Sequence, residues 1–193
     1  GFGMAWIGVL DPKTLDVIPT AWAGIDSEWL AQSRNTVRAD IPLGQGLLGR
    51  ALREKRAIFS NDITTEPSQG GPRRREAVRR GYRSMIVLPL VVEDAAVGNF
   101  TLFVKEPNFF NEAELKLLID LAGDISFALD NIARQQKLEK LSRIRIVSSE
   151  INAAIVRIPE RRALLEETCR IASEQGKFAL VLIGTIAPEK QEV

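Results

Sequence analysis

Six arginines between positions 73 and 83 are the residues with the most obvious binding chemistry. They are Arg73, Arg74, Arg75, Arg79, Arg80 and Arg83. A planar guanidinium group donates paired hydrogen bonds to a carboxylate or a phosphate, so this cluster predicts an anion site. A solvated helix face is the alternative interpretation, because charged side chains are usually exposed. Arg83 is the best candidate of the six, since it lies with Tyr82 and Ser84 at the start of a predicted strand that would direct it into a pocket.

Aromatic and acidic residues extend this candidate pocket. Trp6 and Trp29 could stack on a ligand, although tryptophans more often belong to a core. Asp62 follows a short predicted strand, where it either pairs with one of the arginines or simply ends that strand. The candidate ligand-binding residues are Trp6, Trp29, Asp62, Arg79, Tyr82, Arg83 and Ser84.

The sequence of 193 residues contains no histidine and one cysteine, Cys169. Histidine is the usual general base near neutral pH, the commonest metal ligand and the usual axial ligand to haem. We therefore expect no catalytic residue, no metal site and no cofactor. A single cysteine forms no disulfide within the chain and fits a reducing compartment, so we expect the protein to be cytoplasmic.

The overall charge is close to balanced, with 26 lysines and arginines against 25 aspartates and glutamates. This balance argues against nucleic-acid binding, although binding through the arginine cluster stays open as an alternative. No apolar run approaches the roughly 18 residues that a membrane span needs, so we expect no membrane partner for this part of the protein.

Alternating apolar residues and turn signals predict a chain of strands and short helices. The predicted strands cover 2–10, 15–23, 36–41, 57–59, 84–92 and 96–105, and the predicted helices cover 27–30, 47–52 and 72–80. Pro19 places the second strand at a sheet edge, because proline cannot donate to a neighbouring strand. Glu93 and Asp94 join the last two strands as a hairpin.

A long helix follows, and Asn111 with Glu114 forms a capping box at its start. The helix meets no proline before Pro159, so it could run roughly 70 Å. Its apolar residues form two stripes that differ in phase, which are Leu115, Leu118, Ala122, Ile125, Leu129 and Ile132, and then Leu141, Ile144, Ile151, Ile155 and Ile158. The first stripe predicts packing on a sheet. The second fits a coiled coil with another chain or packing within this one.

The opening of the chain recurs near its end without a gap. Five positions of the first strand and turn, namely Phe2, Ile7, Gly8, Pro12 and Val17, reappear as Phe178, Ile183, Gly184, Pro188 and Val193. A repeat of this length indicates tandem copies of one domain. We therefore expect a strand at 178–186.

The order and spacing of several segments resemble the GAF domain family. These segments are 2–8, 41–51, 61–63, 79–84, 88–90 and 109–122. The resemblance implies an α+β fold of the GAF-like, PAS-related kind, with an antiparallel sheet of about five to six strands and helices on both sides. It also implies a ligand pocket in front of the sheet, roofed by residues 25–82. Such domains act in bacterial signal transduction, often ahead of a histidine kinase or a cyclic-di-nucleotide enzyme.

The resemblance divides the chain into three parts. Residues 1–133 would be a GAF domain without its N-terminal helix, residues 134–158 a signalling helix, and residues 159–193 the start of a second GAF domain. Asp40-Ile41-Pro42 is similar to a motif of bilin-binding members, but the cysteine and histidine that those members use are missing. The cyclic-nucleotide signature is missing too, and the methionine sulfoxide reductases of this fold need several cysteines. We therefore expect a non-catalytic sensor with an unidentified small-molecule ligand, and the alternative is a relay module with no ligand.

The expected partners are a second copy of the chain and a downstream effector domain. The dimer and relay residues would be Leu129, Ile132, Leu141, Ile144, Ile151 and Ile155. Without an N-terminal helix, the sheet needs another cover for its apolar face. We expect the segment 159–186 to dock on a GAF sheet, either its own or that of a second chain by domain swapping.

Overall fold

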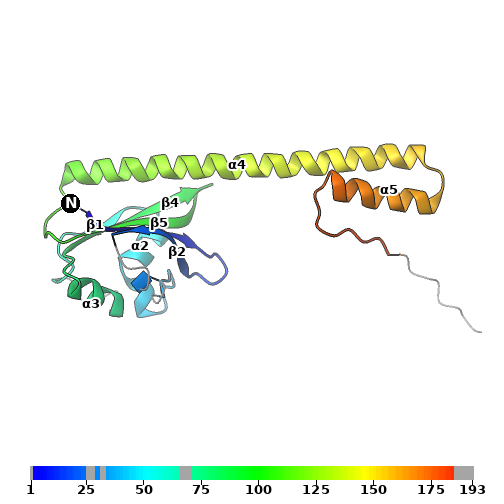
Figure 1. Ribbon diagram of the computed structural model, residues 1–193. Helices are drawn as coiled ribbons and strands as arrows, with labels where there is room; N and C mark the ends of the chain where they lie inside the picture. The colour runs from blue at the N-terminus through cyan, green and yellow to red at the C-terminus, as the bar shows by residue number, and fades with distance from the viewer. Residues whose placement is uncertain (1, 25–28, 31–33, 66–70, 185–193) are drawn as a thin grey trace, which may run out of the picture. The chain divides into compact units, whose positions relative to one another are not determined.

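The computed structural model describes residues 2–24, 29–30, 34–65 and 71–184, and the side chains of these residues except 71–73 (Figure 1). The chain forms two compact units, residues 1–132 and residues 133–193. Long helix α4 (Glu112–Arg157) belongs in part to each of them.

A five-stranded antiparallel sheet is the centre of the first unit. Its strands are β1 (Phe2–Leu10), β2 (Val17–Ala23), β3 (Ile58–Ser60), β4 (Ser84–Val92) and β5 (Ala95–Val104). Their order is β2-β1-β5-β4-β3, which places Pro19 on an edge strand as expected. The expected hairpin is also confirmed, since Glu93 and Asp94 both have positive φ, as a tight two-residue turn requires.

Short helices cover one face of the sheet, which we call the front. They are the 3₁₀ helix η1 (Pro42–Gln45), α2 (Leu47–Glu54) and α3 (Gly71–Arg79). The front core beneath them includes Met4, Trp6 and Val17 of the edge and neighbouring strands and Phe103 of β5. Met4 and Trp6 share this face because side chains two residues apart on a strand point the same way.

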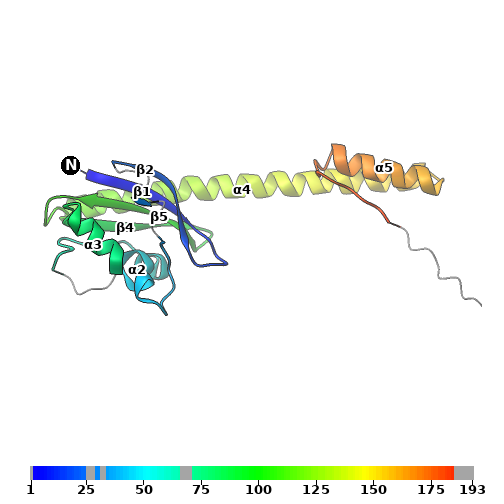
Figure 2. The ribbon, with the colours of Figure 1, turned by 60° about the horizontal axis from the view of Figure 1, so that its bottom comes forward.

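The first part of α4, residues 112–132, covers the back face (Figure 1 and Figure 2). Its Leu118 and Ala122 pack on buried side chains of the two central strands, which are Ile86, Leu88, Leu102 and Val104. The expected capping box is present, because Asn111 Oδ1 accepts from Ala113 N at 2.9 Å and Glu114 Oε2 accepts from Asn111 N at 3.2 Å. The expected α+β class, with an antiparallel sheet and helices on both sides, is therefore confirmed.

The second unit is a helical hairpin made of the last part of α4 and α5 (Arg161–Glu174). Val147 and Ala154 of α4 enclose Ile171 of α5. Glu160 caps α5 by accepting hydrogen bonds from Arg162 N at 2.9 Å and Ala163 N at 2.5 Å. The apolar face of α5 that was expected to cover a sheet packs on α4 within this unit. Docking of 159–186 on a GAF sheet, either its own or that of a second chain, stays a prediction.

Two expected strands differ from the structure. Within 36–41 only Thr36 makes a strand-like bridge, to Asp16, and the chain then turns where Arg38 pairs with Asp40 at 2.5 Å. Pro42 has no N–H to donate and begins η1, which ends any extended run. Residues 178–184 form no strand, and 185–186 lie outside the described part of the chain. A single strand is not stable without a hydrogen-bonded partner. Of the expected helix at 27–30, residues 29–30 are helical, and 27–28 lie outside the described residues.

Candidate functional site

A hollow of about 70 Å³ lies between the front face of the sheet and the short helices. We call it the front pocket. Its lining comes from every part of the front layer, and consists of Trp6, Trp29, Asn35, Thr36, Leu43, Gly46, Leu47, Leu48, Ile63, Arg74, Ala77, Met85 and Phe103. Most of these side chains are apolar, as is usual for sites that enclose a small molecule.

The sheet supplies the floor of the front pocket. Trp6 lies on β1, and Met85 and Phe103 are cross-strand partners on β4 and β5. The Phe103 ring meets Trp29 edge-on, with 6.3 Å between ring centroids. These aromatic contacts hold the floor rigid, because edge-to-face pairs fix the orientation of both rings.

The roof is the segment from Asn35 to the first turn of α2, and Arg53 of α2 fastens it. Its Nη1 donates hydrogen bonds to Val37 O and Gly44 O, both at 2.6 Å. The backbones of η1 and α2 lie very close together here, since a Cβ atom at Gly49 would lie 1.9 Å from Gly44 O. Only glycine fits at such a crossing, which explains the glycines of this stretch.

Helix α3 forms the side wall through Arg74 and Ala77, which lie one turn apart. Arg74 Nε donates a hydrogen bond to Ile63 O, and this bond fixes the half-buried arginine against the loop after β3. At the next turn the Arg80 guanidinium lies over the Trp29 ring, 5.1 Å from its centroid. A cation above an aromatic face is attracted to it, so this contact ties α3 to the Trp29 side of the pocket.

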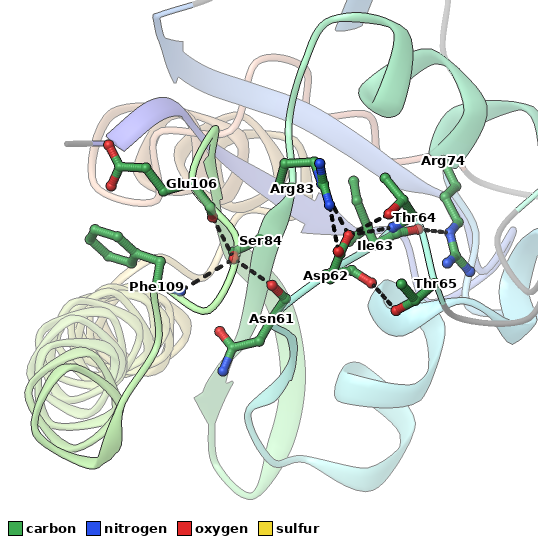
Figure 3. A network of polar contacts seen from close by, with 10 residues as sticks. All are labelled: Asn61, Asp62, Ile63, Thr64, Thr65, Arg74, Arg83, Ser84, Glu106 and Phe109. Atoms are coloured by element: carbon green, nitrogen blue, oxygen red, sulfur yellow. Dashed lines mark hydrogen bonds and ion pairs between the residues drawn. The ribbon is translucent and has the colours of Figure 1, made fainter.

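The structure brings Trp6 and Trp29 to the pocket and places the other five predicted site residues elsewhere. Arg83 and Asp62 form a bidentate ion pair, with Nη2 2.6 Å from Oδ2 and Nε 3.1 Å from Oδ1. Thr64 donates two further hydrogen bonds to Asp62 Oδ1, at 2.6 and 3.0 Å (Figure 3). The Arg83 guanidinium, followed by Thr64, holds the pKa of the Asp62 carboxyl well below its usual range.

Ser84 belongs to the same polar network, which joins the loop after β3, the start of β4 and the segment after β5 (Figure 3). Its Oγ lies 2.9 Å from Asn61 O and 2.7 Å from Glu106 O, and accepts a hydrogen bond from Phe109 N. Ser84 is fully buried, so its hydroxyl fastens three chain segments and faces no ligand space.

Tyr82 and Arg79 differ in solvent exposure, because Tyr82 is buried and Arg79 is exposed. Tyr82 is buried in the front core, where its ring packs on Phe103 at 5.3 Å between centroids, and burial raises the pKa of its hydroxyl. Arg79 points into solvent on the outer side of α3, 3.8 Å from Glu76. Neither residue lines the front pocket.

Sequence reasoning missed most of the lining residues. Asn35 and Thr36 carry no motif, and the roof leucines at 43, 47 and 48 resemble any core leucine. Arg74 did leave a signal, because it precedes the buried Ala77 by three residues and therefore shares its inward face of α3. Among the described residues there is no group of three or more acidic or cysteine side chains that could hold a metal ion. No described helix is long and apolar enough to cross a membrane.

A family model described as a GAF domain matches residues 1–130. The comparison with curated proteins finds no match. Among solved structures, the chain is similar to a GAF domain/HD domain protein from Geobacter sulfurreducens, with a TM-score of 0.55 and 18% identity over 68% of this chain and 82% of that one.

Two further solved structures show the range of proteins with this fold. One is free methionine-R-sulfoxide reductase from Neisseria meningitidis in complex with its substrate, with a TM-score of 0.53 and 20% identity over 69% of this chain and 71% of that one. The other is a domain described as part of a two-component sensor histidine kinase protein from Sinorhizobium meliloti 1021, with a TM-score of 0.53 and 15% identity over 70% of this chain and 84% of that one. At these identities the likeness shows the fold alone.

Proposed function

Because the chain belongs to the GAF domain family, we propose that it is a non-catalytic sensory module that binds a small molecule in the front pocket and passes the change to helix α4. The observation that carries this proposal is the position of the pocket. It lies between the sheet, α2 and α3. The first turn of α2 forms part of its roof, and the other end of α2 is linked to α4.

The link from the pocket to α4 consists of three contacts. Gly46, Leu47 and Leu48 at the start of α2 line the pocket. At the other end of α2, Lys55 Nζ donates to Asp94 O at 2.5 Å, in the turn between β4 and β5. In the same turn, Glu93 N donates to Asp130 Oδ1 of α4 at 3.2 Å. A ligand that shifts α2 would therefore move the turn that holds α4.

The relay part of the proposal involves a dimer through the second half of α4. Four of the six residues expected at this interface, namely Ile132, Leu141, Ile144 and Ile155, are exposed in the single chain. Leu141, Ile144, Ile151 and Ile155 repeat at the spacing of a two-stranded coiled coil. Ile151 also contacts the core of the α4–α5 hairpin, so exposed positions give the cleaner test.

We expect the double variant Leu141→Lys with Ile144→Lys to be monomeric in light scattering. The control variant Lys140→Ala with Arg143→Ala should stay dimeric. A dimeric double-lysine variant would place the interface elsewhere.

The absence of catalysis rests on the chemistry of the pocket lining. Thr36 carries the one hydroxyl among the described lining residues, and that hydroxyl donates to Leu15 O at 2.7 Å. The single cysteine of the sequence, Cys169, lies on α5 in the second unit. We therefore expect no reduction of free methionine sulfoxide by the chain with dithiothreitol as reductant, and reproducible thiol-dependent turnover would overturn the proposal.

Nucleic-acid binding through the arginine cluster has weaker support. Arg79 and Arg80 both lie beside Glu76, at 3.8 and 3.0 Å, and Arg83 is paired with Asp62. These pairs reduce the positive field of the cluster.

The test of ligand binding is native mass spectrometry of the purified chain after exposure to a metabolite extract and gel filtration. We expect a retained small molecule in the natural sequence. The variant Ala77→Leu should lose it, because Ala77 is a buried lining residue and a larger side chain would occupy the pocket. Ala128→Leu, at an exposed position of α4, is the matched control and should keep it. An empty natural chain, or an equal adduct on a folded Ala77→Leu variant, would contradict the proposal.

A further inference from the structure

Three consecutive residues after β3 contact three different parts of the first unit (Figure 3). Ile63 lines the front pocket and belongs to the front core. Asp62 is paired with Arg83, directly before β4. Asn61 is hydrogen-bonded to Phe110, which lies just before the cap of α4 and belongs to the back core. The 61–63 segment therefore connects the pocket with the start of α4.

The backbone of Ile63 is fixed on both sides of the residue. Its N–H donates to Arg83 O at 2.7 Å, and its carbonyl accepts a hydrogen bond from Arg74 Nε of α3. The hollow of about 70 Å³ in front of it is small compared with the roughly 300 Å³ or more of most sites for organic ligands. An organic ligand therefore has to displace part of the lining, and Ile63 moves only together with the groups that hold its backbone.

Only one residue separates Ile63 from Asn61. Peptide units are planar and consecutive Cα atoms stay about 3.8 Å apart, so a segment of this length has few dihedral angles that can absorb a displacement. Asp62 between them is itself held, since its carboxylate is paired and its O accepts from Thr65 N at 3.3 Å. At the other end, Asn61 makes two hydrogen bonds with the buried Phe110. A shift of Ile63 therefore reaches the residue that precedes the cap of α4.

We propose that the 61–63 segment couples the lining of the front pocket to the start of α4, so that occupation of the pocket changes how firmly Asn61 holds Phe110. This inference rests on the proposed function of the pocket as a ligand site. It adds a second route to α4, which is separate from the contact of the β4–β5 turn with Asp130.

Amide hydrogen exchange, followed by NMR on the complete chain, tests this coupling without a ligand. Ile63→Val removes one methyl group at the pocket end, and we expect the Phe110 amide to exchange about threefold to tenfold faster. The rate is compared with that of the Leu102 amide on the central strand β5, where exchange reports opening of the whole sheet. The matched control Leu48→Val removes one carbon from a lining side chain of α2 and should leave the relative rate of Phe110 unchanged.

An unchanged relative rate for Phe110 in Ile63→Val would overturn the inference. An equal acceleration in Leu48→Val would do the same, because the effect would then come from the pocket as a whole and not from the 61–63 segment.

The reverse effect gives an independent readout, because coupling between two sites is reciprocal. Asn61→Ala removes the two hydrogen bonds to Phe110, so we expect affinity for the small molecule retained from the metabolite extract to fall about fivefold or more in a native mass spectrometry titration. Ile86→Ala is the control, because it destabilises the back core and leaves the 61–63 segment intact. It should keep the affinity of the natural chain. Equal affinity in folded Asn61→Ala and the natural chain, or an equal loss in both variants, would overturn the inference.

The failure of this inference is distinguishable from failure of the proposed function. A compound that is retained by the natural chain and lost in Ala77→Leu, with unchanged exchange of Phe110 in Ile63→Val, would leave the pocket a ligand site and remove this route. A pocket that retains nothing would remove the ligand function, and the exchange rates alone would then decide whether the segment couples the pocket lining to α4.

Discussion

The two faces of the sheet are closed in different ways. On the back, Ile86 and its neighbours are buried against α4, and Asn61 ties the start of that helix to the loop after β3 through two hydrogen bonds to Phe110, both at 2.9 Å. On the front, Met85, the residue next to Ile86 on β4, borders a hollow. Two adjacent residues of β4 therefore have different surroundings, a packed core for Ile86 and a pocket for Met85. Substitutions at these two positions should affect stability and ligand binding separately.

The largest effect should come from the packed face. Ile86→Ala removes a fully buried side chain beneath α4, so we expect the free energy of unfolding in urea to fall by about 2–5 kcal/mol, with unchanged affinity for the small molecule retained from the metabolite extract. Ile146→Ala, at an exposed position of α4, should cost under about 1 kcal/mol. A clear loss of affinity in Ile86→Ala would show that the faces are not independent.

Removing the tie to the start of α4 should have the next largest effect. Asn61→Ala deletes both hydrogen bonds to the buried Phe110 backbone, and we expect a loss of about 2–3 kcal/mol in the free energy of unfolding. The control Asn152→Ala lies at an exposed position of α4 and should stay within about 0.5 kcal/mol. A loss for Asn61→Ala no larger than the control would mean that packing alone holds the helix.

Met85→Ala should show the opposite balance to Ile86→Ala. The side chain already borders open space, so we expect a smaller stability loss, about 1–2 kcal/mol, together with a threefold to roughly tenfold weaker affinity for the small molecule retained from the metabolite extract. Urea denaturation and native mass spectrometry on the same preparation measure both. An unchanged affinity would place the ligand away from the sheet.

The smallest effect concerns the Asp62–Arg83 pair, which is partly exposed. Because the folded pKa of Asp62 lies below its unfolded value, the pair stabilises the fold above about pH 4 and loses that contribution as the pH falls further. Asp62→Asn should therefore melt below the natural chain at pH 7, and the difference in melting temperature should shrink toward pH 3. A constant difference across this range would show that ionisation of Asp62 does not contribute.

Local patterns in the sequence were sufficient for much of the fold. Apolar runs on either side of the Glu93–Asp94 turn located β4 and β5, and Asn111 with Glu114 located the start of α4, because these signals act between residues close in the chain. The expected strands at 36–41 and 178–186 depended on distant partners. Propensity alone cannot supply a neighbouring strand, and in the described parts of these segments the structure provides only the bridge from Thr36 to Asp16.

The candidate site was less predictable for the same reason. Trp6 and Trp29 were identified from residue type, whereas the pocket itself is the space left between segments that are far apart in sequence. Arg83 carried the stronger motif, yet Asp62, 21 positions earlier, neutralises it. Arg74 lines the pocket because α3 turns it inward with Ala77. Which arginine lines the pocket is decided by tertiary packing, and the cluster alone does not show it.

Hydrogen–deuterium exchange with and without the small molecule retained from the metabolite extract tests the central claim most directly, because it reports both the site of binding and its reach. We expect slower exchange in the first turn of α2 and in α3, which border the pocket, and a change at the β4–β5 turn and at α4 around Asp130, which the turn contacts. Slower exchange confined to α5, or to the network around Asp62 and Ser84 with α2 unaffected, would contradict it.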